Sequence, residues 1–501
     1  MILSKSNYML FLRHPAWLWL KKFNKHKLPP VDDNLQAIFD AGHEFESYAE
    51  KLYPDATHLG FNNYNQYLSL PARTKKALGE NAKTITQGRF EAGGLTCIVD
   101  VLDRVENNIF NLIEIKSSTK VKPEHYYDLA FQIIVLEKSE INVQKIEVIH
   151  VNKDYVRKGD IDPVKITSRV DVTQKVRALI EITKKQIDKA FAVLSQKVIP
   201  DISPCLVNQI NVPNTQWFQD WLAIYKTLNP NLDSYSIYRL SYPNAQQISQ
   251  LEEKGICNIG EILEELALRP KQLSQIQTTR DNKRIIDKQK IKEFLSTFTY
   301  PLYFFDYETF SHVIPYFDGC QPFGDYPFQY SLHILDKPGA KLKHTEYLHT
   351  KNSNPMPELI EKLKQDIGNK GTILTWNMSY EKACNDRMAK FYPEHTEFLK
   401  SLNRRIKDLM TPFSKMWFVD KDFYGSASLK NVLPVLAPEL SYKDLDIADG
   451  LLARRTWTNT VLKGENLDQK NKIMLNLSEY CTLDTFAMVR ILEELNKIST
   501  T

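Results

Sequence analysis

Two carboxylates stand in the middle of an aromatic, β-favouring stretch at residues 300–310, Tyr-Pro-Leu-Tyr-Phe-Phe-Asp-Tyr-Glu-Thr-Phe. This composition predicts a buried strand that carries Asp306 and Glu308. Side chains two apart project from the same face of a strand, roughly 6 to 7 Å apart at about 3.3 Å rise per residue. Three apolar residues share that face and indicate that it is covered: Leu302, Phe304 and Phe310.

Two like charges on a covered strand repel each other and lose hydration, so a compensating charge is required. A divalent cation such as Mg²⁺ or Mn²⁺ takes carboxylate oxygens as ligands. We therefore predict a metal site at Asp306 and Glu308. The alternative is an edge strand whose acids face water.

Two later segments supply further inward-facing acids. Residues 373–377 predict a strand that ends in Asn, followed by a helix whose inner stripe includes Glu381. Residues 477–495 predict an amphipathic helix on which Asp484 lies one turn after Tyr480, on the apolar face. A lone carboxylate on such a face is costly unless it is paired or bound, so Asp484 is either a metal ligand or a salt-bridged acid.

The N-terminal part contains a second set of polar residues on predicted elements. Residues 95–103 and 109–118 predict a hairpin with Asp100 on one strand and Glu114 and Lys116 on the other. In this arrangement the acids could hold a cation that polarises a phosphate, and the lysine could stabilise developing charge or position water. The alternative is a cross-strand salt bridge at a solvent-facing edge.

Two predicted helices flank this hairpin. Residues 35–53 predict a helix with Glu46 on its inward stripe, either paired with a basic residue or used as a ligand. Residues 124–136 predict a second helix, on which Asp128 and Gln132 lie one turn apart along a face that is otherwise apolar.

In chain order, Gly42-His-Glu-Phe-Glu46, Asp100, Glu114-Ile-Lys116 and Gln132 resemble the PD-(D/E)xK nuclease signature of the RecB-like type. The resemblance implies a restriction-endonuclease-like domain that acts on nucleic acid, with DNA favoured over RNA. It implies metal ligation by Glu46, Asp100 and Glu114, with Lys116 and Gln132 as catalytic residues. Relatives with an iron–sulfur cluster carry a cysteine where this chain has His14, so we expect no cluster.

The acids of the C-terminal part resemble those of DnaQ-like 3′→5′ exonucleases of the RNase H-like fold, in the DEDDy subtype with tyrosine in the last motif. The resemblance implies that two Mg²⁺ or Mn²⁺ ions are held by four carboxylates: Asp306, Glu308, Glu381 and Asp484. Tyrosine, with a pKa near 10, is a poor general base at neutral pH, so Tyr480 is expected to position water. Glu381 stands where the wider superfamily usually has Asp.

Further stretches extend the resemblance over nearly the whole chain, to a bacterial family of unassigned function that joins the two nuclease types. These stretches are residues 325–334, 408–412, 424–434 and 440–442. Within them, Asp408 is either beside the site or a structural cap, and Lys430 either contacts phosphate or is a surface lysine. We predict an α/β protein with a RecB-like domain at 1–198, a mainly helical connector at 199–298 and a DnaQ-like domain at 299–501. Within the connector, helices are predicted at 217–225, 246–254 and 259–268 and across the charged run 280–295.

Composition bounds the remaining possibilities. The 501 residues are 43% hydrophobic and 25% charged, with a net charge of +4, which neither demands nor excludes nucleic acid as a partner. Six cysteines without a CxxC pair predict reduced thiols in the cytoplasm, and the N-terminal apolar run lacks the features of a signal peptide or membrane span. The sequence leaves two hypotheses open: a metal-dependent nuclease with two sites, and a nucleic-acid-binding scaffold with one or no active site.

Overall fold

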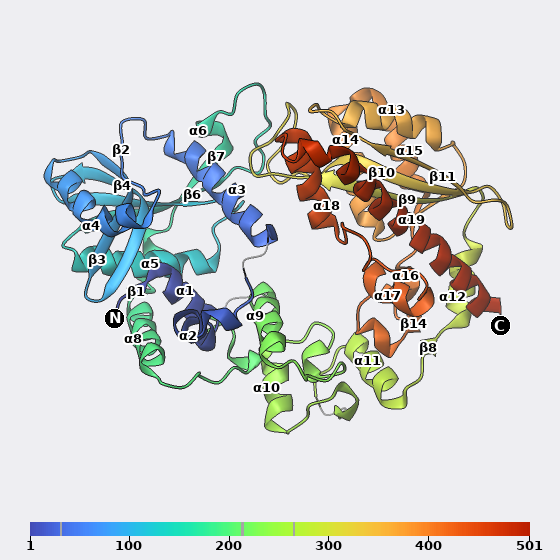
Figure 1. Ribbon diagram of the computed structural model, residues 1–501, viewed down its shortest axis with the longest axis horizontal. Coiled ribbons are helices and arrows are strands. Elements are labelled where there is room, and N and C mark those ends of the chain that lie inside the picture. Colours follow the sequence, from blue (N-terminus) through green and yellow to red (C-terminus); the bar gives the residue numbers. More distant parts are fainter. Residues whose placement is uncertain (31–32, 212–214, 264–265, 501) are drawn as a thin grey trace. The chain divides into compact units, whose positions relative to one another are not determined.

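The computed structural model describes residues 1–30, 33–211, 215–263 and 266–500 (Figure 1). The protein is a mixed α/β chain that divides into two compact units. Unit 1 comprises residues 1–232, 244–249 and 313–323, and unit 2 comprises residues 233–243, 250–312 and 324–501. The predicted domain boundaries at residues 198 and 298 stay predictions.

Unit 1 is built on a mixed sheet in the order β2-β3-β4-β5-β6-β7, with β1 paired to β4. Its strands are β1 Leu3–Ser4, β2 Thr57–His58, β3 Thr84–Ala92, β4 Leu95–Glu106, β5 Ile109–Lys116, β6 Asn142–Val151 and β7 Thr167–Asp171. Its helices are α1 Lys5–Arg13, α2 Pro15–Phe23, α3 Asp33–Glu50, α4 Tyr64–Gly79, α5 Pro123–Lys138, α6 Pro163–Ile166, α7 Thr173–Arg177, α8 Ile180–Ser195 and α9 Thr215–Leu228. The predicted hairpin is therefore confirmed as β4 and β5, which pair antiparallel.

Helices cover both faces of β5, and strands β4 and β6 pair with its two edges. Phe45 of α3 packs with Ile113 and Ile115 on one face. The opposite face carries Glu114, whose carboxylate meets Gln132 of α5. The alternate residues of this one strand thus serve the apolar core on one side and a polar site on the other.

Unit 2 is built on a five-stranded sheet in the order β11-β10-β9-β12-β13. Its larger elements are β9 Leu302–Phe310, β10 Tyr326–Leu335, β11 Lys343–Leu348, α13 Met356–Asp366, β12 Thr372–Thr375, α14 Met378–Phe391, α15 Thr396–Arg405, β13 Ile406–Asp408, α17 Leu429–Leu436, α18 Gly450–Trp457 and α19 Lys470–Thr500. Strand β9 pairs antiparallel with β10 and parallel with β12, and β12 pairs parallel with β13. The predicted strand at 300–310 is therefore the central strand of this sheet.

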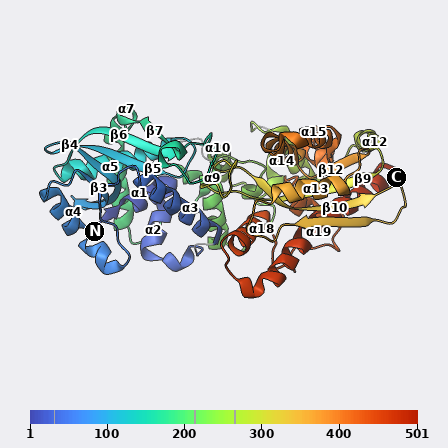
Figure 2. The same ribbon diagram turned by 90° about the horizontal axis from the view of Figure 1, so that it is seen from above.

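Helices cover both faces of the unit 2 sheet (Figure 2). Leu302 and Phe304 of β9 pack in one core with Met488 of α19. On the other face, the hydroxyl of Tyr307 donates a hydrogen bond of 2.9 Å to Asn385 of α14. The two predicted helices that carry Glu381 and Asp484 are therefore confirmed, as α14 and the long α19.

The middle of the chain is less regular than its sequence suggests. It holds α10 Ala245–Glu253, α11 Pro270–Asp281, β8 Ile285–Ile286 and α12 Lys288–Ser296, and β8 pairs with β14 Phe418–Val419. A prediction of one helix across the charged run 280–295 is wrong, because Asn282 adopts a left-handed conformation (φ 50°) that ends α11. A helix predicted over 259–268 is reduced to a 3₁₀ turn at Ile259–Glu261, and residues 264–265 of that stretch lie outside the described chain.

None of the helices that the structure describes combines the length and apolar character needed to span a bilayer. All six cysteines are free thiols.

Candidate functional site

The carboxylates of Asp306 and Glu308 project from the interior strand β9. Because β10 and β12 flank β9, the alternative of an edge strand that faces water is wrong. Only 7% of Glu308 is exposed, and its carboxylate accepts no hydrogen bond from any described residue. The structure thus places two acids on a covered strand, as their spacing predicts, and leaves the deeper one without a polar partner.

Buried polar contacts hold α19 in one register over the sheet. Gln329 of β10, which pairs with Glu308 across the ladder, donates a 3.0 Å hydrogen bond to the carbonyl of Leu477. Ser331, which pairs with Asp306, forms a 2.7 Å hydrogen bond with the hydroxyl of Thr485. A slip of α19 would break these contacts and leave buried polar groups unpaired, which costs about 1 to 3 kcal/mol per group. The register therefore keeps the polar residues of α19 beside the acids of β9.

Asp484 is the acid that α19 brings to this site. Tyr442 donates a short hydrogen bond to its carboxylate, and Tyr480 lies one helical turn away on the same face. Burial raises the pKa of Asp484 to about 6, against the lowering effect of hydrogen bonds from Tyr442 and Tyr480. Burial also raises the pKa of Tyr480 far above that of a free tyrosine, which favours a hydrogen-bonding role over a basic one.

Glu381 enters from the first turn of α14. The side chain is 1% exposed, and its Oε2 atom has no hydrogen-bond partner. Burial, and then the charge of Asp306, raises the pKa of Glu381 well above its usual value. An orphaned carboxylate oxygen at this depth requires a cation or a proton.

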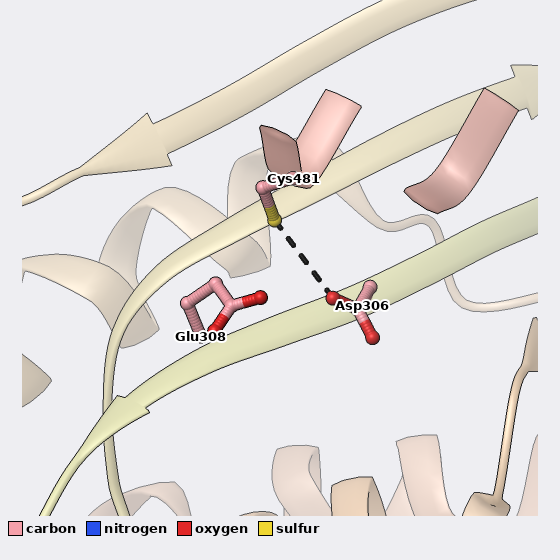
Figure 3. A group of neighbouring side chains, drawn as sticks. All are labelled: Asp306, Glu308 and Cys481. Carbon is pink, nitrogen blue, oxygen red and sulfur yellow. Dashed lines mark hydrogen bonds between the residues drawn. The ribbon is translucent and has the colours of Figure 1, made fainter. Parts of the chain in front are cut away.

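The thiol of Cys481 lies beside the carboxylates of Asp306 and Glu308. Each of three residues offers one ligand atom, and these atoms lie within 4.8 Å of one another: Asp306, Glu308 and Cys481 (Figure 3). The Sγ–Oδ2 distance between Cys481 and Asp306 is 3.9 Å. Cys481 was not predicted as a site residue, although its spacing of three residues from Asp484 places both on one side of a helix.

Little positive charge compensates the carboxylates of the unit 2 site, although Lys430 lowers the pKa of Glu308 and of Asp484 without forming an ion pair. Within the described chain, no lysine, arginine or histidine forms an ion pair with any of the four carboxylates: Asp306, Glu308, Glu381 and Asp484. Burial and neighbouring acids raise the pKa of Asp306 and of Glu308 well above the usual range. This is the electrostatic state that a divalent cation would relieve.

The metal-free protein should show the effect of Asp484 on stability. In the folded chain its pKa is about 6, against about 3.9 in an unfolded chain, so the folded state binds more protons between these values. The contribution of Asp484 to the free energy of unfolding is therefore present at low pH and is lost as pH rises through 6. From pH 5 to pH 7.5, we expect wild type to lose about 1 kcal/mol of unfolding free energy relative to Asp484→Asn.

The comparison with Asp484→Asn is needed because other groups titrate in the same range. Burial lowers the pKa of three histidines to about 4, and these groups make stability rise with pH: His14, His125 and His333. Urea unfolding in EDTA at the two pH values gives the difference between the two proteins. A difference that is constant with pH would contradict the raised pKa of Asp484.

The polar site of unit 1 is organised differently, because lysines neutralise its acids. Glu114, only 1% exposed, accepts hydrogen bonds from Lys5 at 3.0 Å and from Lys116 at 2.6 Å. Lys116 also donates to Asp128 at 2.8 Å, and Lys5 lies 3.5 Å from the same carboxylate. Gln132 donates to Glu114 at 2.7 Å and to Asp128 at 3.2 Å. Two lysines thus bridge two buried carboxylates.

Electrostatics in unit 1 follow from this pairing. Burial alone would raise the pKa of Glu114, but Lys116 and Lys5 outweigh it and hold the pKa below its usual value. The pKa of Asp128 is lowered for the same reason. Both acids are therefore charged at neutral pH without a metal ion.

The remaining two acids predicted for unit 1 lie at the margin of this network. Asp100 accepts a 2.7 Å hydrogen bond from the backbone amide of Ile115. Burial and then Glu114 raise the pKa of Asp100. Glu46 accepts a short hydrogen bond from Gln87, and burial raises its pKa, followed by the charges of Glu50 and Glu114. The structure therefore brings all five predicted residues of unit 1 to one site.

Sequence reasoning missed several members of these sites. Lys5 is 109 residues from its partner Glu114, and no periodic pattern connects the two. The sequence predicts Asp128 one turn before Gln132 on the same helix face but does not assign it to the site. Tyr442 stands in a segment without helix or strand pattern, so its contact with Asp484 carries no local signal.

The structure also places Asp408 and Lys430, for which the sequence left two interpretations each. Asp408 caps a turn, because its carboxylate accepts hydrogen bonds from the amides of Asn377 at 3.1 Å and Met410 at 3.0 Å. It also lies beside the site, because its charge raises the pKa of Glu381. Lys430 is an exposed side chain that donates to the carbonyl of Ala448 at 2.7 Å. Its charge still reaches the site, because it lowers the pKa of Asp484.

His14 is held in place by two hydrogen bonds and by stacking on a tryptophan. Its Nδ1 atom accepts a 3.1 Å hydrogen bond from the amide of Ala16, so Nε2 carries the proton that contacts the carbonyl of Ser203 at 3.0 Å. The ring stacks on Trp221, with 3.8 Å between ring centroids. Both ring nitrogens are thus engaged by backbone groups.

Comparisons with known proteins give similarity without an assigned activity. Residues 303–428 match the family model described as Domain of unknown function (DUF2779). Uncharacterized protein MG366 of Mycoplasma genitalium is 26% identical over 208 residues, which are 38% of this chain and 31% of that protein. Uncharacterized protein UU173 of Ureaplasma parvum is 22% identical over 210 residues, which are 38% of this chain and 30% of that protein. This chain thus spans about a third of the length of these curated relatives, and the family match includes Asp306, Glu308 and Glu381 but ends before Asp484.

Proposed function

We propose that this chain is a metal-dependent nuclease that hydrolyses phosphodiester bonds in nucleic acid. The observation that carries the proposal is the unit 2 site, where Asp306 and Glu308 lie in one ligand group and interact with further buried acids without an ion pair among the described residues. Those further acids are Glu381 and Asp484, whose charges both interact with that of Asp306. Oxygen ligands in this number are what Mg²⁺ and Mn²⁺ select. When bound, such cations stabilise the attacking and leaving oxygens of an in-line displacement at phosphorus.

Each residue of unit 2 has a role in this proposal. The four carboxylates hold the cation or cations, and the unpartnered Oε2 atom of Glu381 is available for that purpose. Tyr480 positions water by hydrogen bonding, because its raised pKa makes it a poor base. Lys430 adds positive charge near the site, where a phosphate of the substrate would lie.

The fold of unit 2 supports a DnaQ-like, DEDDy-type assignment. Asp306 and Glu308 lie on the central strand of a five-stranded mixed sheet, and Tyr480 and Asp484 lie on a helix packed against that strand. This arrangement is compatible with an RNase H-like domain and, by that resemblance, with 3′→5′ exonuclease activity. Glu381 in place of Asp extends the arm of one ligand by a methylene group.

The arrangement in unit 1 supports a PD-(D/E)xK assignment. Asp100 meets the strand that carries Glu114 and Lys116, and Gln132 contacts Glu114 from α5. In this proposal the acids Glu46, Asp100 and Glu114 hold the cation. Lys116 stabilises charge at the phosphate. DNA is the favoured substrate through the RecB-like resemblance alone, since contacts to phosphate do not distinguish the sugar.

A second candidate function applies to unit 1. Lys5 and Lys116 already neutralise Glu114 and Asp128, so these acids require no metal ion. Unit 1 would then bind nucleic acid without cleaving it, and unit 2 would carry out the chemistry.

A cleavage assay with four proteins separates these possibilities: unaltered protein, Lys116→Ala, Asp306→Ala and the double variant. Each is incubated with end-labelled single- and double-stranded DNA and RNA, with Mg²⁺ or Mn²⁺ or with EDTA. Two working sites predict that the two single variants lose different products and that the double variant loses both. If only Asp306→Ala abolishes cleavage, unit 1 binds without cutting. If unaltered protein binds but cuts no substrate with either ion, the nuclease proposal fails.

A further inference from the structure

We infer that Cys481 is a metal ligand of the unit 2 site, together with Asp306 and Glu308, and that this site takes a thiophilic divalent cation such as Zn²⁺. The inference rests on the proposed function only in that both require a cation at these acids. It goes further because a sulfur ligand changes which cation the site prefers. Thiolate ligands favour Zn²⁺, whereas carboxylate ligands alone favour Mg²⁺ and Mn²⁺.

The position of Cys481 is set by the same contacts that place Asp484. The hydroxyl of Thr485, one turn after Cys481, hydrogen-bonds Ser331 on the strand next to β9. Cys481 is fully buried, and its Sγ atom lies 3.9 Å from Oδ2 of Asp306. In Figure 3 the thiol of Cys481 and the two carboxylates converge on one small volume.

Glu308 gives a second, independent indication of a ligand. Its side chain is 7% exposed and accepts no hydrogen bond from a described residue. Its carboxylate is directed toward Asp306 and Cys481 (Figure 3). A buried carboxylate without a polar partner is costly, so its direction toward two other ligand atoms points to a bound cation.

The distances approach those of a tetrahedral centre. Zinc bonds to sulfur at about 2.3 Å and to carboxylate oxygen at about 2.1 Å. At the tetrahedral angle these bond lengths place sulfur about 3.6 Å from an oxygen ligand and two oxygen ligands about 3.4 Å apart. The Sγ–Oδ2 distance of 3.9 Å is already close to that value. All three ligand atoms lie within 4.8 Å of one another, so binding requires side-chain rotations that move the more distant atoms closer by up to about 1.4 Å.

Metal binding releases one proton from the thiol of Cys481. The S–H bond of Cys481 breaks as the sulfur–metal bond forms, and the proton passes to the solvent. The competing interpretation is a core thiol that donates a weak hydrogen bond to Asp306 and binds no metal.

The test uses full-length protein titrated with Co²⁺, whose thiolate complexes have a charge-transfer absorption band, and with Zn²⁺ and Mn²⁺ by calorimetry. Unaltered protein should show the band at one equivalent. Cys481→Ser should lose the band and should bind Zn²⁺ at least about tenfold more weakly, while its Mn²⁺ affinity changes much less. Cys384→Ser is the matched control, because Cys384 is also buried in unit 2 but lies outside the ligand group.

Three outcomes are decisive. If Cys481→Ser keeps both the band and the Zn²⁺ affinity, or if Cys384→Ser loses them equally, the inference is overturned. Should Cys481→Ser fold poorly, Cys481→Ala and Asp306→Asn take its place, and retention of the band in both would overturn it equally. Failure of the proposed function is distinct, because it appears as absent cleavage with Mg²⁺ and Mn²⁺ whether or not the Co²⁺ band forms.

Discussion

Asp306→Asn is expected to lower cleavage by the unit 2 site by about 10³-fold, which corresponds to about 4 kcal/mol of transition-state stabilisation. The asparagine keeps the shape of the side chain but removes the charge that would bind a divalent cation. Asp306 lies on the central strand, with Glu308 and Cys481 as its neighbours in the ligand group, so its loss affects the whole site. The rate is measured on end-labelled substrate at saturating Mn²⁺.

Asp306→Asn should be more stable than wild type in the metal-free protein and less stable than wild type when Mn²⁺ is bound. In EDTA at pH 8, Asp306→Asn should raise the melting temperature, because burial and the charge of Asp484 make an ionised Asp306 unfavourable. With Mn²⁺, wild type should gain stability and the variant should gain little. Asp446→Asn is the control, since Asp446 is exposed and pairs with Lys472. Equal stabilisation of wild type and Asp306→Asn by Mn²⁺ would place the ion elsewhere.

Glu114→Ala is expected to destabilise unit 1 by about 4 kcal/mol. The substitution removes the carboxylate that Lys5, Lys116 and Gln132 all contact. Two largely buried ammonium groups would then share Asp128 alone. Breaking a buried ion pair in this way is much more costly than losing a surface pair.

The measurement is urea unfolding followed through domain-specific hydrogen exchange, because a chain of two units need not unfold in one step. Glu137→Ala is the control, as Glu137 is an exposed residue of α5 and should change stability by less than about 0.5 kcal/mol. If Glu114→Ala were as stable as this control, the network of lysines and acids in unit 1 would not contribute to its stability.

The elements that carry the candidate sites could be predicted because their patterns are local. Asp306 and Glu308 stand two apart in an aromatic run, and this period is sufficient to predict β9 and a shared face. The stripe through Asp484 likewise predicts α19. The failed prediction of one helix across the charged run 280–295 is explained by turn chemistry. Asn282 tolerates the left-handed conformation that ends a helix, and the prediction overlooked this signal within a run of charged residues.

Contacts between distant segments could not be predicted from these patterns. Lys5 joins Glu114 only because β1 pairs with β4 and sets α1 beside the hairpin. Tyr442 reaches Asp484 from a segment without regular structure. The opposite charge balance of the two sites depends on such contacts, because two lysines neutralise the acids of unit 1 while the acids of unit 2 have no such partner among the described residues.

The most direct test of the central claim is the anomalous diffraction signal of Mn²⁺ in crystals of the full chain. Our account predicts a peak bonded to Asp306 and Glu308, with Asp484 or Glu381 as a further ligand, and loss of that peak in Asp306→Asn. A map without density at these carboxylates at millimolar Mn²⁺ would contradict the account, because their buried charge would then be compensated by protons alone.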